Sequence, residues 1–360
     1  MYHCIDCGSP YPQDSIPFRC PYCNGIYSFY ELPAYDPRKF SDHPGLWRYK
    51  YAFDLPKGAP EIYLGEGDTP LVWDSINNRD VAFKLEFLNP TGSFKDRGTA
   101  VVMSFLKSRG ADIVMDDSSG NAGSSLAAYA ASAGVHAKIY VPAYASGPKI
   151  KQISAYGAEV IKVPGPRSGA KDAVLKATLH GNVYASHSLL PQGIPGYATT
   201  AYEICEQLRS VPGTIIMPIG QGNLLISIGA AFSSMHKSGR IGKVPELIGV
   251  QAKACAPIWK AFLSGEESIK DIEEGETIAE GVRTKDPYRL YQVVQSVKVS
   301  NGKVIAVEES AILKGQISLA HHGFYVEPTS AIVWDAIEQV LPEATDPIVV
   351  ILTGSGLKGS

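Results

Sequence analysis

Residues 89–98 read Asn89-Pro90-Thr91-Gly92-Ser93-Phe94-Lys95-Asp96-Arg97-Gly98, and this stretch decides the fold. It follows the largely apolar run 81–88, which predicts a strand, and it opens a segment, 94–106, whose apolar spacing predicts a helix. We therefore expect Lys95 near a helix N-terminus, where the positive end of the dipole disfavours the ammonium form. A lone Ser-Phe-Lys would indicate a surface lysine in a loop. Ten such consecutive residues instead favour a lysine that holds an aldehyde cofactor.

Beyond residue 58, apolar runs alternate with segments whose apolar spacing is helical. Strands are expected at 113–115, 137–141, 160–163, 214–218, 247–250 and 348–352. Helix-like segments lie between them, such as 124–131 and 197–208. This alternation predicts an α/β fold with parallel sheets covered on both faces by helices.

Length and charge restrict the class of protein. A chain of 360 residues exceeds the ~100–200 of a usual single domain, so two lobes and a small appendage are expected. A net charge of -3 gives no general attraction to nucleic acid or to an anionic membrane. The apolar runs are far shorter than the ~20 residues of a membrane span, and the N-terminus lacks a signal-peptide pattern. We expect a soluble cytoplasmic protein.

Four cysteines near the N-terminus form two Cys-x2-Cys pairs separated by twelve residues. They are Cys4, Cys7, Cys20 and Cys23. Two such pairs complete a closed tetrahedral shell, which predicts a structural Zn²⁺ in a zinc ribbon. Disulfides and an iron centre are the alternatives, and the reducing compartment of a metabolic enzyme favours zinc. Cys205 and Cys255 lie in apolar contexts and are expected to be core thiols.

The stretch around Lys95 resembles that of fold-type II pyridoxal phosphate enzymes, and its sequence is most similar to the corresponding motif of threonine synthases. Five further segments match motifs of that family in order: 66–71, 118–121, 220–223, 326–331 and 352–358. The resemblance implies a tryptophan synthase β-like fold, a pyridoxal 5'-phosphate cofactor and a homodimer. It also implies a zinc ribbon at 1–30, a connector at 31–58, a large cofactor-binding domain from 59–98 and 211–360, and a small domain at 99–210.

The family roles carry over to matching positions. Lys95 would anchor the cofactor and move the α-proton. The loop Gly220-Gln221-Gly222-Asn223, with Leu224 at the start of the next helix, would cradle the cofactor phosphate. Asn121 would bind the phenolic oxygen. Thr353, or Ser355 in a shifted register, would face the ring nitrogen, and a hydroxyl there favours elimination and replacement over transamination.

A substrate carboxylate would bind at the start of the helix that follows residue 121. The donors would be Ser118, Ser119 and Gly120, and Ser119 could also be the helix N-cap.

Substrate recognition departs from the threonine synthase pattern. Ala122 stands where that family has a threonine, and Gly193 stands where it has the arginine for the phosphate of O-phospho-L-homoserine. Losing one partner of a buried ion pair costs about 3–5 kcal/mol. Four residues are candidates to compensate: Lys149 and Lys151 at a helix start, Arg167 in a Pro-Gly loop, and His187 after a strand end. Solvated surface roles are the alternative for the first three, and His187 is expected near the substrate entrance.

Three functions remain open. The first is a lyase resembling threonine synthase, which converts O-phospho-L-homoserine and water to L-threonine and phosphate. The second is a β-eliminating or β-replacing enzyme acting on threonine, serine or O-phosphoserine, because segments 149–160 and 277–282 are similar to threonine and serine ammonia-lyases. The third is a non-catalytic scaffold, which the intact cofactor motifs disfavour.

Overall fold

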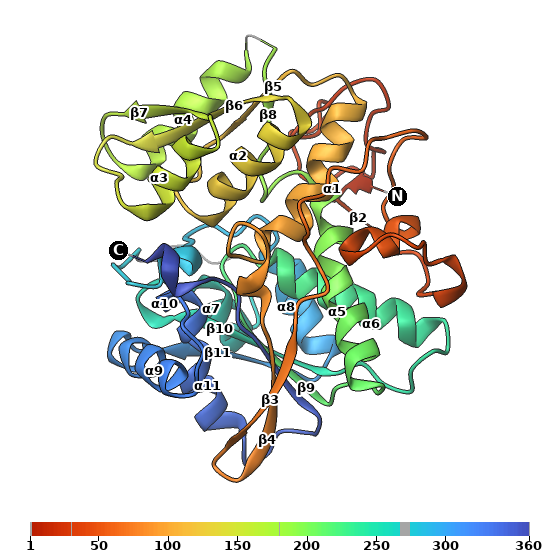
Figure 1. Cartoon of the computed structure of the whole chain (residues 1–360), viewed down its shortest axis with the longest axis vertical. Coiled ribbons are helices and arrows are strands. Elements are labelled where there is room, and N and C mark those ends of the chain that lie inside the picture. The colour runs from red at the N-terminus through yellow and green to blue at the C-terminus, as the bar shows by residue number, and fades with distance from the viewer. Residues whose placement is uncertain (1, 30, 180, 267–273, 360) are drawn as a thin grey trace.

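The computed structural model describes residues 2–29, 31–179, 181–266 and 274–359, which form two sheets with their helices and a small N-terminal ribbon (Figure 1). The larger sheet has six strands in the order β11-β10-β9-β12-β4-β3. Their bounds are β3 Leu71–Ile76, β4 Arg79–Lys84, β9 Thr214–Pro218, β10 Glu246–Ala252, β11 Lys303–Val307 and β12 Ile348–Ile351. Neighbours are parallel except at the edge, where β3 runs antiparallel to β4.

This antiparallel edge was not expected from the sequence. β3 and β4 are joined by Asn77 and Asn78, whose φ angles are +49° and +62°. Two left-handed residues make the tight hairpin turn that asparagine tolerates. The predicted strand 81–88 is also too long, because β4 ends at Lys84 and Glu86–Leu88 forms a 3-10 turn.

The smaller sheet has four parallel strands in the order β7-β6-β5-β8. They are β5 Ile113–Asp116, β6 His136–Pro142, β7 Glu159–Val163 and β8 Val183–Tyr184. Helices α2 Asn121–Ala133, α3 Pro148–Ala155 and α4 Arg167–Thr178 accompany it in the upper half of Figure 1. The strands of the larger sheet fall within 59–98 and 211–360 and those of the smaller sheet within 99–210, the ranges that we propose for a large and a small domain.

Alternation along the larger sheet fills two cores, one on each face. The other described helices are α1 Lys95–Ser108, α5 Ile194–Leu208, α6 Asn223–Lys237, α7 Pro257–Ser264, α8 Leu290–Val299, α9 Glu309–His321, α10 Pro328–Ala331 and α11 Val333–Val340. In β12, Val349 and Ile351 join the core formed with α1, α5, α6 and α8, whereas Ile348 and Val350 join the core formed with α9 and α11. The predicted α/β fold with covered parallel strands is confirmed.

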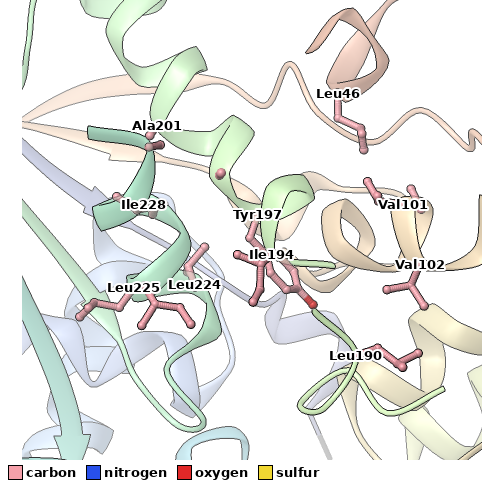
Figure 2. Close-up of a cluster of buried hydrophobic side chains, with 14 of the residues drawn as sticks. Leu46, Val101, Val102, Leu190, Ile194, Tyr197, Ala201, Leu224, Leu225 and Ile228 are labelled. Atoms are coloured by element: carbon pink, nitrogen blue, oxygen red, sulfur yellow. The ribbon is translucent and has the colours of Figure 1, made fainter. Parts of the chain in front are cut away.

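Helices α1, α5 and α6 pack where the two halves meet. Figure 2 shows Val101 of α1, Ile194 and Tyr197 of α5, and Leu225 of α6 in one buried cluster. A Cβ on Gly196 would lie 2.2 Å from the Arg97 carbonyl oxygen, so α5 crosses α1 in close contact. The first turn of α1 is thereby held firmly.

A fully buried charge cluster lies beneath that turn. Arg97 pairs with Glu86 at 2.7 Å and with Glu203 at 2.6 Å, and Lys84 pairs with Glu203 at 2.7 Å. The four charges sum to zero, and they join β4, α1 and α5. Removing one member of such a buried cluster costs about 3–5 kcal/mol because it leaves an uncompensated charge.

The N-terminal ribbon consists of β1 Tyr2–Cys4 paired antiparallel with β2 Tyr27–Phe29. It packs against the rest of the molecule through Phe18, whose ring centroid lies 5.3 Å from that of Tyr184. Short 3-10 turns occur at Pro37–Lys39, Gly45–Ala52, Glu86–Leu88, Pro191–Gly193, Lys253–Cys255, Glu280–Val282 and Gly356–Lys358. Among the described residues, no helix combines the length and apolar character needed to span a membrane.

Candidate active site

A cavity of about 510 Å³ lies between the two sheets, where several helices begin. Its lining includes the first residues of α1, α2, α4 and α6, which are Lys95, Asn121, Arg167 and Asn223. Helix N-termini present free N–H groups and positive dipole ends. The cavity therefore favours an anionic ligand.

Lys95 is the first residue of α1, and its Nζ lies 4.6 Å from the centroid of the Phe94 ring. Burial lowers the pKa of the Lys95 ammonium to about 8, against the opposing influence of the Asp116 and Glu327 carboxylates. The preceding turn is fixed by Asp96, which accepts hydrogen bonds from the Thr91 N–H at 2.7 Å and from the Ser125 hydroxyl at 2.7 Å. A sizeable fraction of the lysine is thus a neutral amine near pH 8, as a nucleophile needs.

The loop between β9 and α6 is shaped by its glycines. Gly222 has a φ of +85°, and a Cβ there would lie 2.1 Å from Val293 Cγ2. A Cβ on Gly220 would lie 2.8 Å from the Gly281 carbonyl oxygen. All of Gly220, Gln221, Gly222, Asn223 and Leu224 line the cavity. Only glycine fits at these two positions, and the loop leaves room for a ligand at the start of α6.

Asn121 and Glu327 meet at the cavity wall. The Asn121 amide donates to Glu327 Oε1 at 2.6 Å, while Asn121 Oδ1 is buried without a hydrogen-bond partner among the described residues. Lys149 Nζ lies 2.8 Å from Glu327 Oε2. Lys149 is therefore paired rather than solvated as its sequence position suggested. Glu327 was not singled out from the sequence, although its segment was.

Thr353 follows β12 and lines the cavity. Its Oγ1 is buried, with no hydrogen-bond partner in the described part of the chain. Ser355 instead accepts a hydrogen bond from the Leu357 N–H at 3.2 Å and is not among the cavity-lining residues. The geometry thus favours Thr353 over Ser355 for contact with a bound ring.

Of the three predicted carboxylate donors, Ser118 lines the cavity. Ser119 and Gly120 are half-buried between it and α2 and are outside the set of lining residues. Gly120 occupies the N-cap position of α2, and Ser118 Oγ accepts from its N–H at 3.3 Å. The prediction that Ser119 caps this helix is therefore wrong, because α2 begins at Asn121 and its N-cap is Gly120.

The two departures from the family pattern lie in different places. Ala122 lines the cavity, but Gly193 is buried under α1, where a Cβ would lie 3.4 Å from the Gly98 carbonyl oxygen. Of the candidate replacements, Arg167 and His187 line the cavity and exposed Lys151 does not. Arg167 begins α4 rather than lying in a loop. Sequence reasoning missed further lining cations, which are Lys171, Arg283 and Lys285.

The four N-terminal cysteines converge, with their sulfurs all within 4.8 Å of one another. Cys4 Sγ lies 3.4 Å from Cys23 Sγ, and Cys7 Sγ lies 3.6 Å from Cys20 Sγ; no disulfide joins them. Thiolates about 2.3 Å from a tetrahedral zinc are about 3.8 Å apart. The arrangement fits a four-sulfur metal site.

The cavity also fits a phosphorylated pyridine aldehyde. It combines an amine of lowered pKa, a glycine-shaped anion loop, and buried oxygens of Asn121 and Thr353 that lack protein partners within the described part of the chain. A family profile described as pyridoxal-phosphate dependent enzyme matches residues 62–354. The chain belongs to the pyridoxal-phosphate dependent enzyme family.

This pyridoxal-phosphate dependent enzyme has relatives that match nearly its whole length. It is 32% identical to a threonine synthase of Methanocaldococcus jannaschii, covering 99% of this chain and 93% of that protein. It is 33% identical to a threonine synthase of Synechocystis sp., with 91% and 87% covered. The crystal structure of a threonine deaminase from T.th. superposes with a TM-score of 0.70 at 24% identity, covering 80% of this chain and 92% of that one, which shows the shared fold.

These relatives make the chain a pyridoxal-phosphate-dependent lyase with the fold-type II architecture. The enzyme class and the fold predicted from the sequence are confirmed. The scaffold alternative is not supported.

Proposed function

We propose that this enzyme converts O-phospho-L-homoserine and water to L-threonine and phosphate. The observation that carries the proposal is the identity of 32% to a threonine synthase across 99% of this chain. The Lys95 cavity supports it, because the substrate is an amino acid with a phosphate at its far end and the lining includes arginines and lysines as well as acidic residues.

The proposed roles follow from the positions of the side chains. Bound pyridoxal phosphate would supply the electron sink that acidifies the substrate's α- and β-hydrogens. Lys95 holds the cofactor and, as a neutral amine, accepts the α-proton and later returns it. The loop from Gly220 to Leu224 holds the cofactor phosphate, and Asn121 and Thr353 meet polar atoms of the ring. Ser118, Ser119 and Gly120 bind the substrate carboxylate at the start of α2.

Four cations would hold the substrate phosphate in place of the arginine that is missing at Gly193. Arg167 and Lys171 come from α4, and Arg283 and Lys285 come from a separate lining segment, in which Arg283 also pairs with Glu274 at 3.4 Å. Hydrogen bonds from guanidinium to phosphate are charge-assisted and can be bidentate. A dianionic group at this end of the cavity would therefore be compensated without a residue at position 193.

A β-eliminating or β-replacing reaction on threonine, serine or O-phosphoserine is the second candidate. Gly193 and Ala122 favour it, since both differ from the threonine synthase pattern. The test is to feed the holoenzyme O-phospho-L-homoserine, L-threonine and O-phospho-L-serine and to identify the products. Threonine from the first substrate supports the first candidate. A keto acid from either of the others, with the first untouched, supports the second.

We further propose that Cys4, Cys7, Cys20 and Cys23 bind one structural Zn²⁺. The sulfur distances support this, because four converging free thiols match a tetrahedral shell. Elemental analysis of purified protein should find about one zinc per chain. A metal-free, fully active protein in which these cysteines are oxidised would contradict the proposal.

A cytoplasmic location and a homodimer complete the proposal. The absence of disulfides among the described cysteines, of which Cys205 and Cys255 are not proposed zinc ligands, supports a reducing compartment. Leu313 and Ile317 support self-association, since they lie one turn apart on α9 and are 54% and 58% exposed. Light scattering should give twice the chain mass of 38.7 kDa. A monomer at micromolar concentration would rule the dimer out.

A further inference from the structure

Asp116, His187 and Ser188 form a line of polar groups to which the proposed function gives no role. Asp116 ends β5, is 1% exposed, and has its Oδ2 4.0 Å from His187 Nδ1. His187 Nε2 lies 3.0 Å from Ser188 Oγ. His187 and Ser188 both line the cavity that holds Lys95. The line thus runs from a buried carboxyl group to the wall of the active site.

The segment that carries His187 is held in place through its backbone carbonyl groups. Asn223 donates to the His187 carbonyl oxygen at 2.8 Å. Arg289, which is 1% exposed, donates to the carbonyl oxygens of Ser188 and Leu189. Three successive carbonyls are therefore held from α6 and from the start of α8. Such support fixes a side chain in the geometry that proton transfer requires.

Both members of the pair are pushed toward their neutral forms. Burial raises the pKa of Asp116 well above its ordinary value, and the neighbouring Asp117 carboxylate raises it further. Burial lowers the pKa of His187 well below its ordinary value, and the charges of Lys95 and Arg167 lower it further. The imidazole therefore favours the neutral form that accepts a proton, and it lies beside a buried carboxyl group whose own charged form is disfavoured. The 4.0 Å separation exceeds a hydrogen bond, but catalytic contacts are often long before substrate binds.

We propose that His187, backed by Asp116, is a second acid–base group of this active site and serves the side-chain carbons of the substrate. The inference rests on the proposed function. In that reaction Cβ loses one proton and Cγ gains one, while Lys95 serves Cα. His187 takes the proton from Cβ. The Cγ–O bond then breaks, its electron pair leaves with the phosphate, and His187 delivers the proton to Cγ. Water supplies the hydroxyl at Cβ and the proton that the phosphate takes up.

The test separates α-proton exchange from turnover. Holoenzymes carrying His187→Gln, His187→Asn and Asp116→Asn are incubated with O-phospho-L-homoserine in D₂O, and exchange at Cα and formation of threonine are followed by NMR. For His187→Gln we expect α-exchange within about twofold of wild type and threonine formation slowed about 10²–10⁴-fold, the usual contribution of a general acid–base group. Asp116→Asn should show the same pattern more weakly. His136→Gln is the matched control, since that exposed histidine lies on β6, and it should match wild type in both.

Two results would overturn the inference. Threonine formation within about threefold of wild type in both His187 variants would show that the imidazole takes no part in catalysis. Exchange and turnover that fall together would show that His187 only supports the fold or the cofactor. If the proposed function itself is wrong, the wild-type enzyme will form no threonine from O-phospho-L-homoserine. The same variants are then compared on keto acid formation from L-threonine or O-phospho-L-serine, where the departing group also needs a proton.

Discussion

At the residue scale, the chemistry of the site depends on a few side chains whose environments differ from water. Lys95 is a reactive amine because it is buried, and Thr353 faces the cavity with a hydroxyl that no described protein group uses. Both positions follow from local motifs and could be predicted from the sequence. Glu327 and Lys171 could not, because their place at the cavity depends on packing between segments far apart in the chain. The pairing of Lys149 could not be predicted for the same reason, since its partner Glu327 belongs to the other half of the molecule.

Lys95 should react with pyridoxal phosphate in a pH-dependent way. Its pKa of about 8 means that protonation blocks the amine as the pH falls. Binding of pyridoxal phosphate to cofactor-free enzyme should therefore accelerate about tenfold per pH unit between about pH 6 and 7 and level off above about pH 8. A free lysine side chain, the control, should keep accelerating to higher pH. Borohydride reduction and peptide mapping should label Lys95, and label on another lysine would sink the assignment.

Arg167 should contribute to affinity for a phosphorylated substrate. Arg167→Gln removes a charge-assisted hydrogen bond worth about 1.5–3 kcal/mol, so KM for O-phospho-L-homoserine should rise about 10–100-fold. Lys176→Gln, on an exposed position of the same helix α4, is the matched control and should leave KM unchanged. Equal KM values for wild type and Arg167→Gln would show that another group holds the phosphate.

At the scale of elements, the alternating pattern predicted most strands to within a residue or two, because parallel strands buried on both faces have continuous apolar runs. β3 was missed because it is the exposed edge, where Val72 and Trp73 are 38% and 52% exposed. Arg167 was placed in a loop because Pro164-Gly165-Pro166 suggests one, although Pro166 is the N-cap residue of α4 and the helix begins at Arg167.

The glycine loop at the start of α6 should not tolerate side chains. Gly222→Ala puts a Cβ 2.1 Å from Val293 Cγ2 in a left-handed conformation. We expect the affinity for pyridoxal phosphate, measured by titration of absorbance, to fall at least about tenfold. Gly239→Ala separates steric overlap from backbone strain. Gly239 is also left-handed, with a φ of +69°, but a Cβ there would meet no atom within 4 Å. Unchanged affinity in Gly222→Ala would mean that the loop does not shape the cofactor site.

The buried charge cluster should dominate the stability of the α1–α5 contact. Glu203→Gln leaves Lys84 and Arg97 short of one negative charge and should lower the free energy of unfolding by about 3–5 kcal/mol. Glu343→Gln removes the exposed pair with Lys303 and should cost about 0–1 kcal/mol. Urea unfolding followed by fluorescence and circular dichroism measures both. Similar losses in the two variants would refute a special role for the buried cluster.

At the scale of the whole molecule, the sequence indicated an α/β enzyme with two sheets and a ribbon, because motif order and composition are global properties. It did not indicate how the ribbon meets the catalytic half. Arg289 donates to the Tyr27 carbonyl oxygen at 2.7 Å and also to the segment after His187, so the ribbon supports one wall of the cavity. Such a contact between distant segments has no local signal.

The most direct test of the central claim is the fate of oxygen when wild-type holoenzyme acts on O-phospho-L-homoserine in H₂¹⁸O. We predict equal amounts of L-threonine and phosphate, with ¹⁸O in the threonine hydroxyl and none in the phosphate, because the carbon–oxygen bond breaks and water adds to carbon. Label in the phosphate with release of homoserine, or a keto acid with no threonine, would contradict the account.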